Sequence, residues 1–170
     1  DPENFRRATD AKTRCYYGET LPNPKLTVFP IAEVAKIGRS LGVPRGGAMD
    51  AHALAVANLL TGNAPGAAGL EWALGAGTLC FHAPGLVALA GATVEATLDG
   101  AAIPGETALR VRAGSTLALR RFLRGRFVYV ACAGGIAVPE VLGSRSTYLP
   151  AGFGGLEGRR LRDGDRPLVG

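Results

Sequence analysis

Apolar residues recur at helical spacing in one stretch of the chain, residues 51–61. Four of them occupy positions i, i+3, i+4 and i+7, the spacing of one buried helix face: Ala53, Val56, Ala57 and Leu60. Asp50 stands where a helix N-cap is needed, and Gly62 followed by Asn63 is a typical helix stop. The pattern predicts one short helix here.

Elsewhere after residue 41, apolar residues alternate with polar ones or form short runs that Gly and Pro interrupt, which is typical of β-strands. Residues 70–74 alternate, which predicts a strand with Trp72 on one face and Glu71 on the other. Asp99-Gly100 predicts a type I′ hairpin. Six further strands are predicted at residues 78–82, 86–90, 93–98, 108–112, 116–120 and 127–131.

This succession of short strands predicts a mainly β fold, a barrel or a sandwich. A parallel α/β sheet would need a crossover helix between successive strands, and the pattern supplies only one helix. The 25 Gly and 11 Pro residues are scattered without a period, which favours a turn-rich architecture over a helical bundle. A chain of 170 residues is long enough for one domain with a sizeable core.

Residues 1–40 differ in composition from residues 41–170 and are predicted to be an atypical N-terminal arm or a remnant of a first strand region. All three lysines lie in this segment. Residues 1–24 carry charges and prolines without an apolar period, which indicates an arm or loop, and residues 26–31 are predicted to form one strand. The chain begins with Asp rather than Met, which suggests a processed, truncated or incompletely represented chain.

Composition narrows the classes of function. Hydrophobic residues make up 47% and charged residues 19%, so the chain is expected to fold. The formal net charge of +5 allows weak attraction to acidic partners, but aromatic residues are only 6%, which does not favour nucleic acid. The longest apolar runs, such as residues 86–90, are far shorter than a membrane span. We expect neither a nucleic-acid nor a membrane partner.

The three cysteines, Cys15, Cys80 and Cys132, are odd in number and form no CxxC pair. They indicate neither a disulfide framework nor a zinc knuckle, and they fit a reducing cytoplasm. Alternation places Cys80 and His82 on one strand face, but two ligands do not make a metal site, so no metal is predicted.

Two other motifs have ordinary structural explanations. Residues 38–42 match the GxSxG of serine hydrolases, but residues 43–47 cannot start the helix that this motif requires. A basic segment without an acidic residue between Glu106 and Glu140 is interpreted as solvated strand surface, with anion binding as the alternative. Its members are Arg110, Arg112, Arg120, Arg121, Arg124 and Arg126.

Five blocks, taken in order, are the most distinctive part of the sequence: GVPRGGAMD (42–50), ANLLTGN (57–63), GLEWALG (69–75), YVACAGGIAVPEVLGSRSTYLPAGFGGLEGR (129–159) and LRDGD (161–165). They resemble the biotin-dependent carboxyltransferase-like, or allophanate hydrolase subunit 2, family, which includes the C-type subunit of 5-oxoprolinase and the antikinase partner KipA. The resemblance covers residues 42–170, and residues 1–25 match nothing in it. The family's chain continues into a second β-rich half, so residues 41–170 are expected to be the N-terminal half of such a domain.

The resemblance implies a cyclophilin-like β-barrel and a cytoplasmic complex with A-type and B-type (KipI-like) partner proteins. Together these would hydrolyse 5-oxo-L-proline to L-glutamate with ATP. The chain has no GxxxxGK[ST] loop, so we expect ATP to act at the level of the complex, with no cofactor bound by this chain and no activity of the chain alone. Two alternatives remain open, a non-catalytic KipA-like regulator and the carboxyltransferase part of a biotin-dependent urea carboxylase.

Nine residues of the matched blocks are candidates for the site. Asp50 and Glu71 are the candidate catalytic residues, although Asp50 is equally interpreted as a helix cap and Glu71 as a solvated strand residue. Arg145 offers a forked donor for a carboxylate. With it, the candidate substrate-binding residues are Gly46, Gly47, Met49, Asn63, Ser146 and Thr147.

Overall fold

A computed structural model describes residues 2–10, 33, 34, 37, 46–141 and 143–170. The strand expected at residues 26–31 and the GxSxG segment at 38–42 lie outside these residues. The chain divides into two compact units, one of residues 1–47 with 139–162 and the other of residues 48–138 with 163–170.

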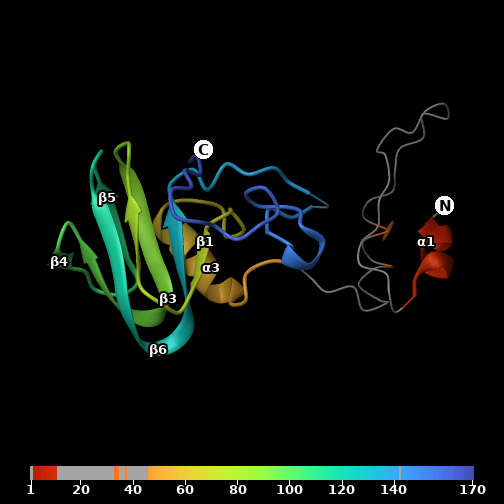
Figure 1. Ribbon diagram of the computed structural model, residues 1–170, viewed down its shortest axis with the longest axis horizontal. Coiled ribbons are helices and arrows are strands. Elements are labelled where there is room, and N and C mark those ends of the chain that lie inside the picture. The colour runs from red at the N-terminus through yellow and green to blue at the C-terminus, as the bar shows by residue number, and fades with distance from the viewer. Residues whose placement is uncertain (1, 11–32, 35–36, 38–45, 142) are drawn as a thin grey trace. The chain divides into compact units, whose positions relative to one another are not determined.

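Two long antiparallel strands form the centre of the unit that contains residues 48–138 (Figure 1). They are β3 (Gly85–Leu98) and β6 (Thr116–Cys132), and they pair from Val87 opposite Cys132 to Leu98 opposite Leu117. Each was expected as two short strands, which was wrong. Gly91 and Gly125 do not end the strands, because they adopt positive φ angles of 108° and 85° within an irregular stretch of the pairing.

Four shorter strands complete the antiparallel sheet. β1 (Leu70–Ala73) and β2 (Gly77–Cys80) pair with β6, and β4 (Ala101–Ala102) and β5 (Thr107–Val111) pair with β3. Asp99 and Gly100 have φ angles of 51° and 84° between paired β3 and β4, so the type I′ hairpin is confirmed. The prediction of a mainly β fold is also confirmed.

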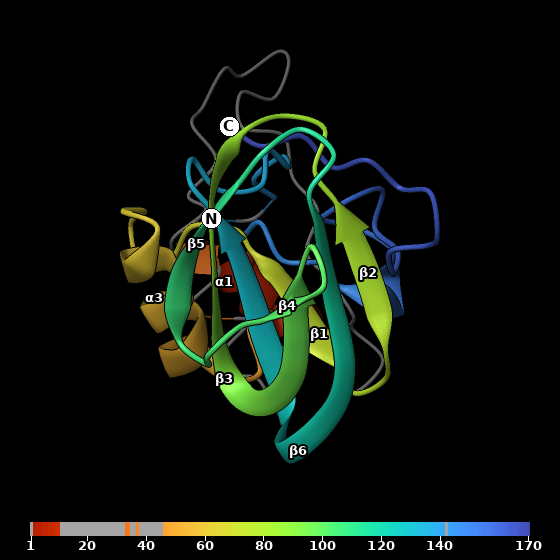
Figure 2. The same ribbon diagram turned by 90° about the vertical axis from the view of Figure 1, so that its left-hand side faces the viewer.

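The core depends on a bend in the two central strands. Their register shifts at three places between Gly91 and Ala96, and both strands curve sharply there (Figure 2). Residues from both sides of the bend therefore meet in one buried cluster, which consists of Leu89, Ala96, Leu117, Leu119, Val128 and Val130. Each fully buried aliphatic side chain stabilises the fold by about 1.5–3 kcal/mol.

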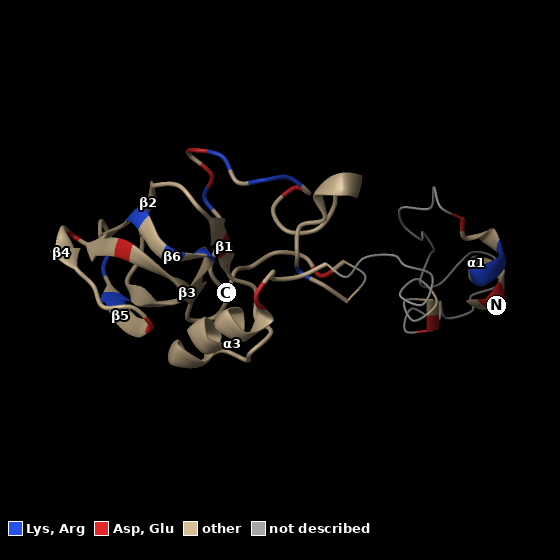
Figure 3. Ribbon diagram, turned by 90° about the horizontal axis from the view of Figure 1, so that it is seen from below, with Lys and Arg blue, Asp and Glu red and all other residues tan. Residues whose placement is uncertain are grey.

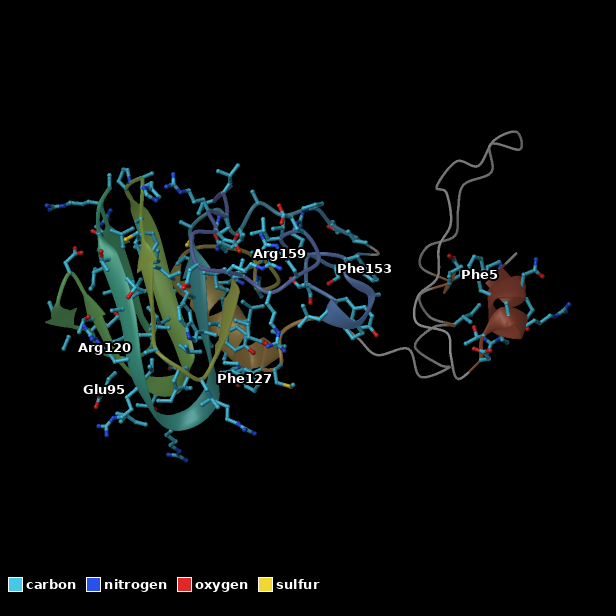
Figure 4. The ribbon with its side chains drawn as sticks, in the orientation of Figure 1. Phe5, Glu95, Arg120, Phe127, Phe153 and Arg159 are labelled. Carbon is cyan, nitrogen blue, oxygen red and sulfur yellow. The ribbon has the colours of Figure 1, made fainter. Side chains whose placement is uncertain are left out.

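The helix α3 (Ala51–Leu60) covers the other face of the sheet and confirms the expected helix. Asp50 caps it, since its Oδ1 atom accepts a hydrogen bond of 3.0 Å from the Ala53 N–H. The helix packs on small residues of β3 and β6, and Phe127 lies beside it (Figure 4). This second cluster contains Ala53, Ala57, Ala90, Tyr129 and Ala131.

In the unit that contains residues 1–47 and 139–162, the described residues form short helices and turns. Its helix α1 (Pro2–Ala8) was expected to be arm or loop, and that interpretation was wrong for this segment. The helix signals are present: proline in the first turn, Glu3 near the N-terminus, and Arg6 and Arg7 in the last turn. A 3₁₀ turn, η1 (Leu149–Ala151), follows Tyr148. Among the described helices, none is long and apolar enough to cross a membrane.

The contact between α3 and the bend predicts the effect of Gly91→Ala. A Cβ atom there would lie 2.7 Å from the Phe127 carbonyl oxygen and 3.3 Å from the Ala53 Cβ. We expect the free energy of unfolding to fall by about 2 kcal/mol or more, from backbone strain and overpacking together. Urea denaturation followed by circular dichroism measures the change.

Gly100→Ala is the matched control. Gly100 also has a positive φ, of 84°, but nothing lies within 4 Å of the place that a Cβ atom would occupy, so only backbone strain of about 1 kcal/mol is expected. Equal losses for the two variants would contradict close packing at Gly91.

Candidate functional site

Glu71 is the centre of a hydrogen-bond network that holds the start of α3. β1 places it opposite Tyr129 of β6 and, as predicted, on the other face from Trp72. Its Oε2 atom accepts one hydrogen bond from the Met49 N–H and one from the Tyr129 hydroxyl, both of 2.7 Å. The Tyr129 oxygen accepts a third, also of 2.7 Å, from the Asp50 N–H. Two strands thus fix the backbone that leads into α3.

Tyr129 lies under this network and is only 1% exposed. Burial is the main cause that raises the pKa of its phenol to about 12. The hydrogen bond from the Asp50 N–H acts in the opposite direction, while the hydrogen bond to Glu71 and the negative charges of Glu71 and Asp50 add to the rise. Tyr129 is therefore a neutral hydrogen-bond donor to Glu71 over the physiological pH range.

The other candidates of this unit differ in their exposure and in how many of their side-chain atoms already make hydrogen bonds within the fold. Met49 is 71% exposed beside Glu71, and Asp50 uses one carboxylate oxygen for its helix cap. The catalytic roles of Asp50 and Glu71 stay predictions. The arrangement itself presents an exposed carboxylate, Glu71, on rigid strands.

Asn63 lies beyond the C-terminus of α3, and its side-chain amide is engaged within the fold. Its Nδ2 atom donates to the Asn58 Oδ1 at 3.0 Å and to the Cys132 carbonyl at 2.7 Å. Its Oδ1 atom accepts from the Gly134 N–H at 2.8 Å. Asn58 is fully buried and donates in turn to the carbonyls of Pro65 and Ala67. This geometry favours a structural role for Asn63 over ligand contact.

The remaining candidates belong to the other unit. The Gly47 N–H donates to the Ser146 Oγ at 2.9 Å, and Gly46 lies against Ser144 and Ser146. Glycine is required at residues 154 and 155, because a side chain at Gly154 would clash with the backbone of Ser146 and one at Gly155 with the side chain of Thr147. Two segments distant in sequence, at residues 46–47 and 144–147, are therefore joined around Ser146.

Arg145 is about half exposed and forms an ion pair of 3.4 Å with Glu140. Of the flanking hydroxyls, the Ser146 Oγ already donates to the Thr147 carbonyl, whereas the Ser144 Oγ only accepts, from the Ser146 N–H. The candidate residues thus fall into two groups by unit. One group contains Met49, Asp50, Asn63 and Glu71, and the other contains Gly46, Gly47, Arg145, Ser146 and Thr147.

The basic segment and the cysteines do not form a second candidate site in the described residues. All six arginines of the basic segment are exposed, and they lie on β5, just beyond it, and on β6 (Figure 3), with Arg121 paired to Glu95 at 2.6 Å. The interpretation of Arg110 and Arg112 as solvated surface is confirmed, with Arg110 on β5 and Arg112 one residue beyond its end. Cys80 is exposed on β2, while burial raises the pKa of the Cys132 thiol. The described residues include no group of three or more His, Cys, Asp and Glu placed to hold a metal ion.

Tyr129 was missed from the sequence, although it completes the network. The one available signal was a hydroxyl-bearing ring in the otherwise apolar run at residues 127–132. A buried tyrosine usually finds a hydrogen-bond partner, but the sequence alone does not say which residue lies across from it.

The raised pKa of Tyr129 predicts a loss of stability at alkaline pH. The folded state holds the phenol proton more tightly than the unfolded chain, whose pKa is near 10.0, so this contribution is intact below pH 10 and is lost as the pH rises toward 12. We expect roughly 2–3 kcal/mol of stability to disappear over that interval and less loss in Tyr129→Phe. Urea denaturation at several pH values measures it.

Tyr148→Phe is the control, because within the described part of the chain the Tyr148 hydroxyl makes no hydrogen bond. This variant should keep the alkaline loss of the unmodified chain. If Tyr129→Phe keeps it too, the phenol is not the titrating group.

Comparison with known proteins identifies the family. Residues 41–169 match the family described as carboxyltransferase domain, subdomain A and B. Over 132 residues the chain is 48% identical to the C-type subunit of 5-oxoprolinase from Escherichia coli, covering 78% of this chain and 43% of that protein. It is 38% identical over 125 residues to urea amidolyase of Saccharomyces cerevisiae, covering 74% of this chain and 7% of that one.

A solved structure gives the same result. The crystal structure of the Kluyveromyces lactis urea carboxylase matches with a TM-score of 0.72 and 38% identity, over 75% of this chain and 11% of that one. The chain therefore spans less than half the length of these relatives. With most of its length matched in sequence and in fold, the chain belongs to the carboxyltransferase domain, subdomain A and B, family.

Proposed function

We propose that this chain is part of a C-type subunit of a 5-oxoprolinase. It would act with A-type and B-type (KipI-like) partner proteins to hydrolyse 5-oxo-L-proline to L-glutamate with ATP. The observation that carries the proposal is the 48% identity to the C-type subunit of the Escherichia coli 5-oxoprolinase. Because that relative is itself one subunit of an enzyme, it supports a multi-subunit assembly here.

The chemistry explains why such an assembly needs ATP. A five-membered lactam is an unactivated amide, and transfer of a phosphoryl group from ATP to its oxygen releases ADP and creates a leaving group. One water adds at the ring carbon and the C–N bond breaks, which gives an acyl phosphate. A second water then releases phosphate and glutamate. We assign the ATP step to a partner, since this sequence has no phosphate-binding loop of the GxxxxGK[ST] type.

Within this proposal the candidate residues are supported to different degrees. Glu71 is supported best, because its carboxylate is exposed and held by two hydrogen bonds. Asp50 is left with one carboxylate oxygen beyond its helix cap. Asn63 is supported least, because its amide already makes three hydrogen bonds within the fold.

A second function is favoured by a specific observation. The likeness to urea amidolyase and urea carboxylase supports the carboxyltransferase part of a biotin-dependent urea carboxylase. In that case the chain would take a carboxyl group from carboxybiotin carried by another domain or chain.

Reconstitution tests the two functions. The chain is mixed with A-type and B-type proteins of the same organism, and glutamate release from 5-oxo-L-proline is measured with and without ATP. We expect release only from the complete mixture with ATP. Release by the chain alone would show that the active site has been assigned wrongly. ATP-dependent carboxylation of urea with a biotin-carrying partner, in place of glutamate release, would establish the second function.

Arg145→Lys tests the assigned carboxylate contact. Lysine keeps the charge but loses the forked donor geometry, so we expect kcat/KM of the complex to fall about tenfold or more, equivalent to about 1.4 kcal/mol. The melting temperature should hardly change, because the ion pair with Glu140 is exposed.

Arg121→Lys is the matched control, since Arg121 is also an exposed arginine paired with one glutamate. It should leave activity unchanged. Equal effects of the two substitutions, or an Arg145→Lys effect that follows the melting temperature, would mean that Arg145 is structural.

A further inference from the structure

Glu71 keeps one carboxylate oxygen available for a ligand. Both hydrogen bonds that it accepts end on Oε2, from the Met49 N–H and from the Tyr129 hydroxyl. Among the described residues nothing donates a hydrogen bond to Oε1. The side chain is exposed, so Oε1 is accessible on this unit.

The carboxylate is also held in a defined orientation. Glu71 and Tyr129 are directly paired residues of β1 and β6, so the sheet ladder sets the separation of their backbones. The phenol ring is 1% exposed and packs with Ala53, Ala57, Ala90 and Ala131, which leaves it little freedom to move. The Met49 N–H holds Oε2 as a second donor. Oε1 is therefore fixed without any ligand being present.

We propose that Tyr129 is a positioning residue that fixes Glu71 so that its Oε1 accepts a hydrogen bond from the N–H of a small amide substrate. This inference rests on the proposed function. The N–H beside a carbonyl is common to the lactam of 5-oxo-L-proline and to urea, so one acceptor suits both. An ionised carboxylate accepts hydrogen bonds and cannot donate them, and its negative charge repels a substrate carboxylate. The N–H edge is therefore the part of the substrate that fits.

The first experiment tests the positioning without any substrate. Amide hydrogen exchange at Met49 and Asp50 is compared in the unmodified chain, Tyr129→Phe and Glu71→Gln. In Tyr129→Phe the Asp50 N–H loses its acceptor, and the Met49 N–H faces a carboxylate that has lost one of its two donors, so both should exchange about tenfold faster or more. In Glu71→Gln one amide oxygen can still accept both donors, so protection should largely remain.

Tyr148→Phe serves as the control, because it removes a tyrosine hydroxyl without a hydrogen bond in the described residues. It should leave both exchange rates unchanged. Unchanged exchange at Met49 in Tyr129→Phe would overturn the positioning role, because Glu71 would then be held without Tyr129.

The second experiment uses the reconstituted complex and 5-oxo-L-proline. Tyr129→Phe and Glu71→Gln should each lower kcat/KM about tenfold or more, and adding Tyr129→Phe to Glu71→Gln should lower it by no more than about twofold. Such non-additivity is expected if the phenol acts through the carboxylate. Additive losses would show that Tyr129 acts independently of Glu71 and would overturn the proposal.

N-methyl-5-oxo-L-proline tests the substrate N–H directly, since it keeps the ring and lacks the donor. We expect its inhibition constant for the unmodified complex to be at least about tenfold higher than the dissociation constant of 5-oxo-L-proline. The ratio of the two constants should be smaller in Glu71→Gln. Equal binding of the two compounds would overturn the acceptor role. Urea and N,N,N′,N′-tetramethylurea form the corresponding arm for the urea-dependent reaction.

The outcomes separate the two proposals. A complex that is inactive on both 5-oxo-L-proline and urea overturns the proposed function and the substrate contact together, while the exchange rates still decide whether Tyr129 positions Glu71. An active complex with additive variants or with equal binding of the methylated compound keeps the function and overturns the inference.

Discussion

β3 and β6 pair along most of their length, but the ladder is interrupted by three register shifts between Gly91 and Ala96. Because both strands bend there, residues from the two ends of each strand share one core cluster. The same bend depends on Gly91, whose missing side chain lets the Phe127 carbonyl and Ala53 of α3 approach closely. The position of α3 against the sheet, and with it the backbone at residues 49 and 50, depends on this irregular pairing.

The hydrogen bonds around Glu71 link the candidate site to this irregular pairing of β3 and β6. Met49 and Asp50 precede α3, yet two strand side chains hold their N–H groups, one from β1 and one from β6. A side chain on a strand is placed more precisely than one on a loop, which suits a group that must meet a substrate in one orientation. Asn63 has a comparable role after the helix, where it ties the end of the α3 segment to residues 132 and 134.

Features that depend on neighbouring residues in the chain were predictable. The helix at α3, its Asp50 cap, the Asp99-Gly100 hairpin and the opposite faces of Trp72 and Glu71 all follow from local spacing. The continuity of β3 and β6 was not predictable. A glycine can mark either a break between two strands or a bulge within one strand, and only the pairing with the neighbouring strand shows which it is. Helix α1 was missed because its signals, a proline in the first turn and charges near both ends, lie in a segment without apolar periodicity.

The site residues show the same limit more sharply. Spacing placed Glu71 on the face away from Trp72, but its partner Tyr129 is 58 residues distant in sequence, and only the strand register brings them together. In the same way, the polar amide of Asn63 suited a ligand contact, whereas its actual partners lie at residues 58, 132 and 134. A polar residue in a matched block therefore has two explanations, ligand contact or internal hydrogen bonding, and what decides between them is whether its donors and acceptors are already used. By that criterion Glu71, with Oε1 open in the described part of the chain, remains the strongest candidate for substrate contact in its unit.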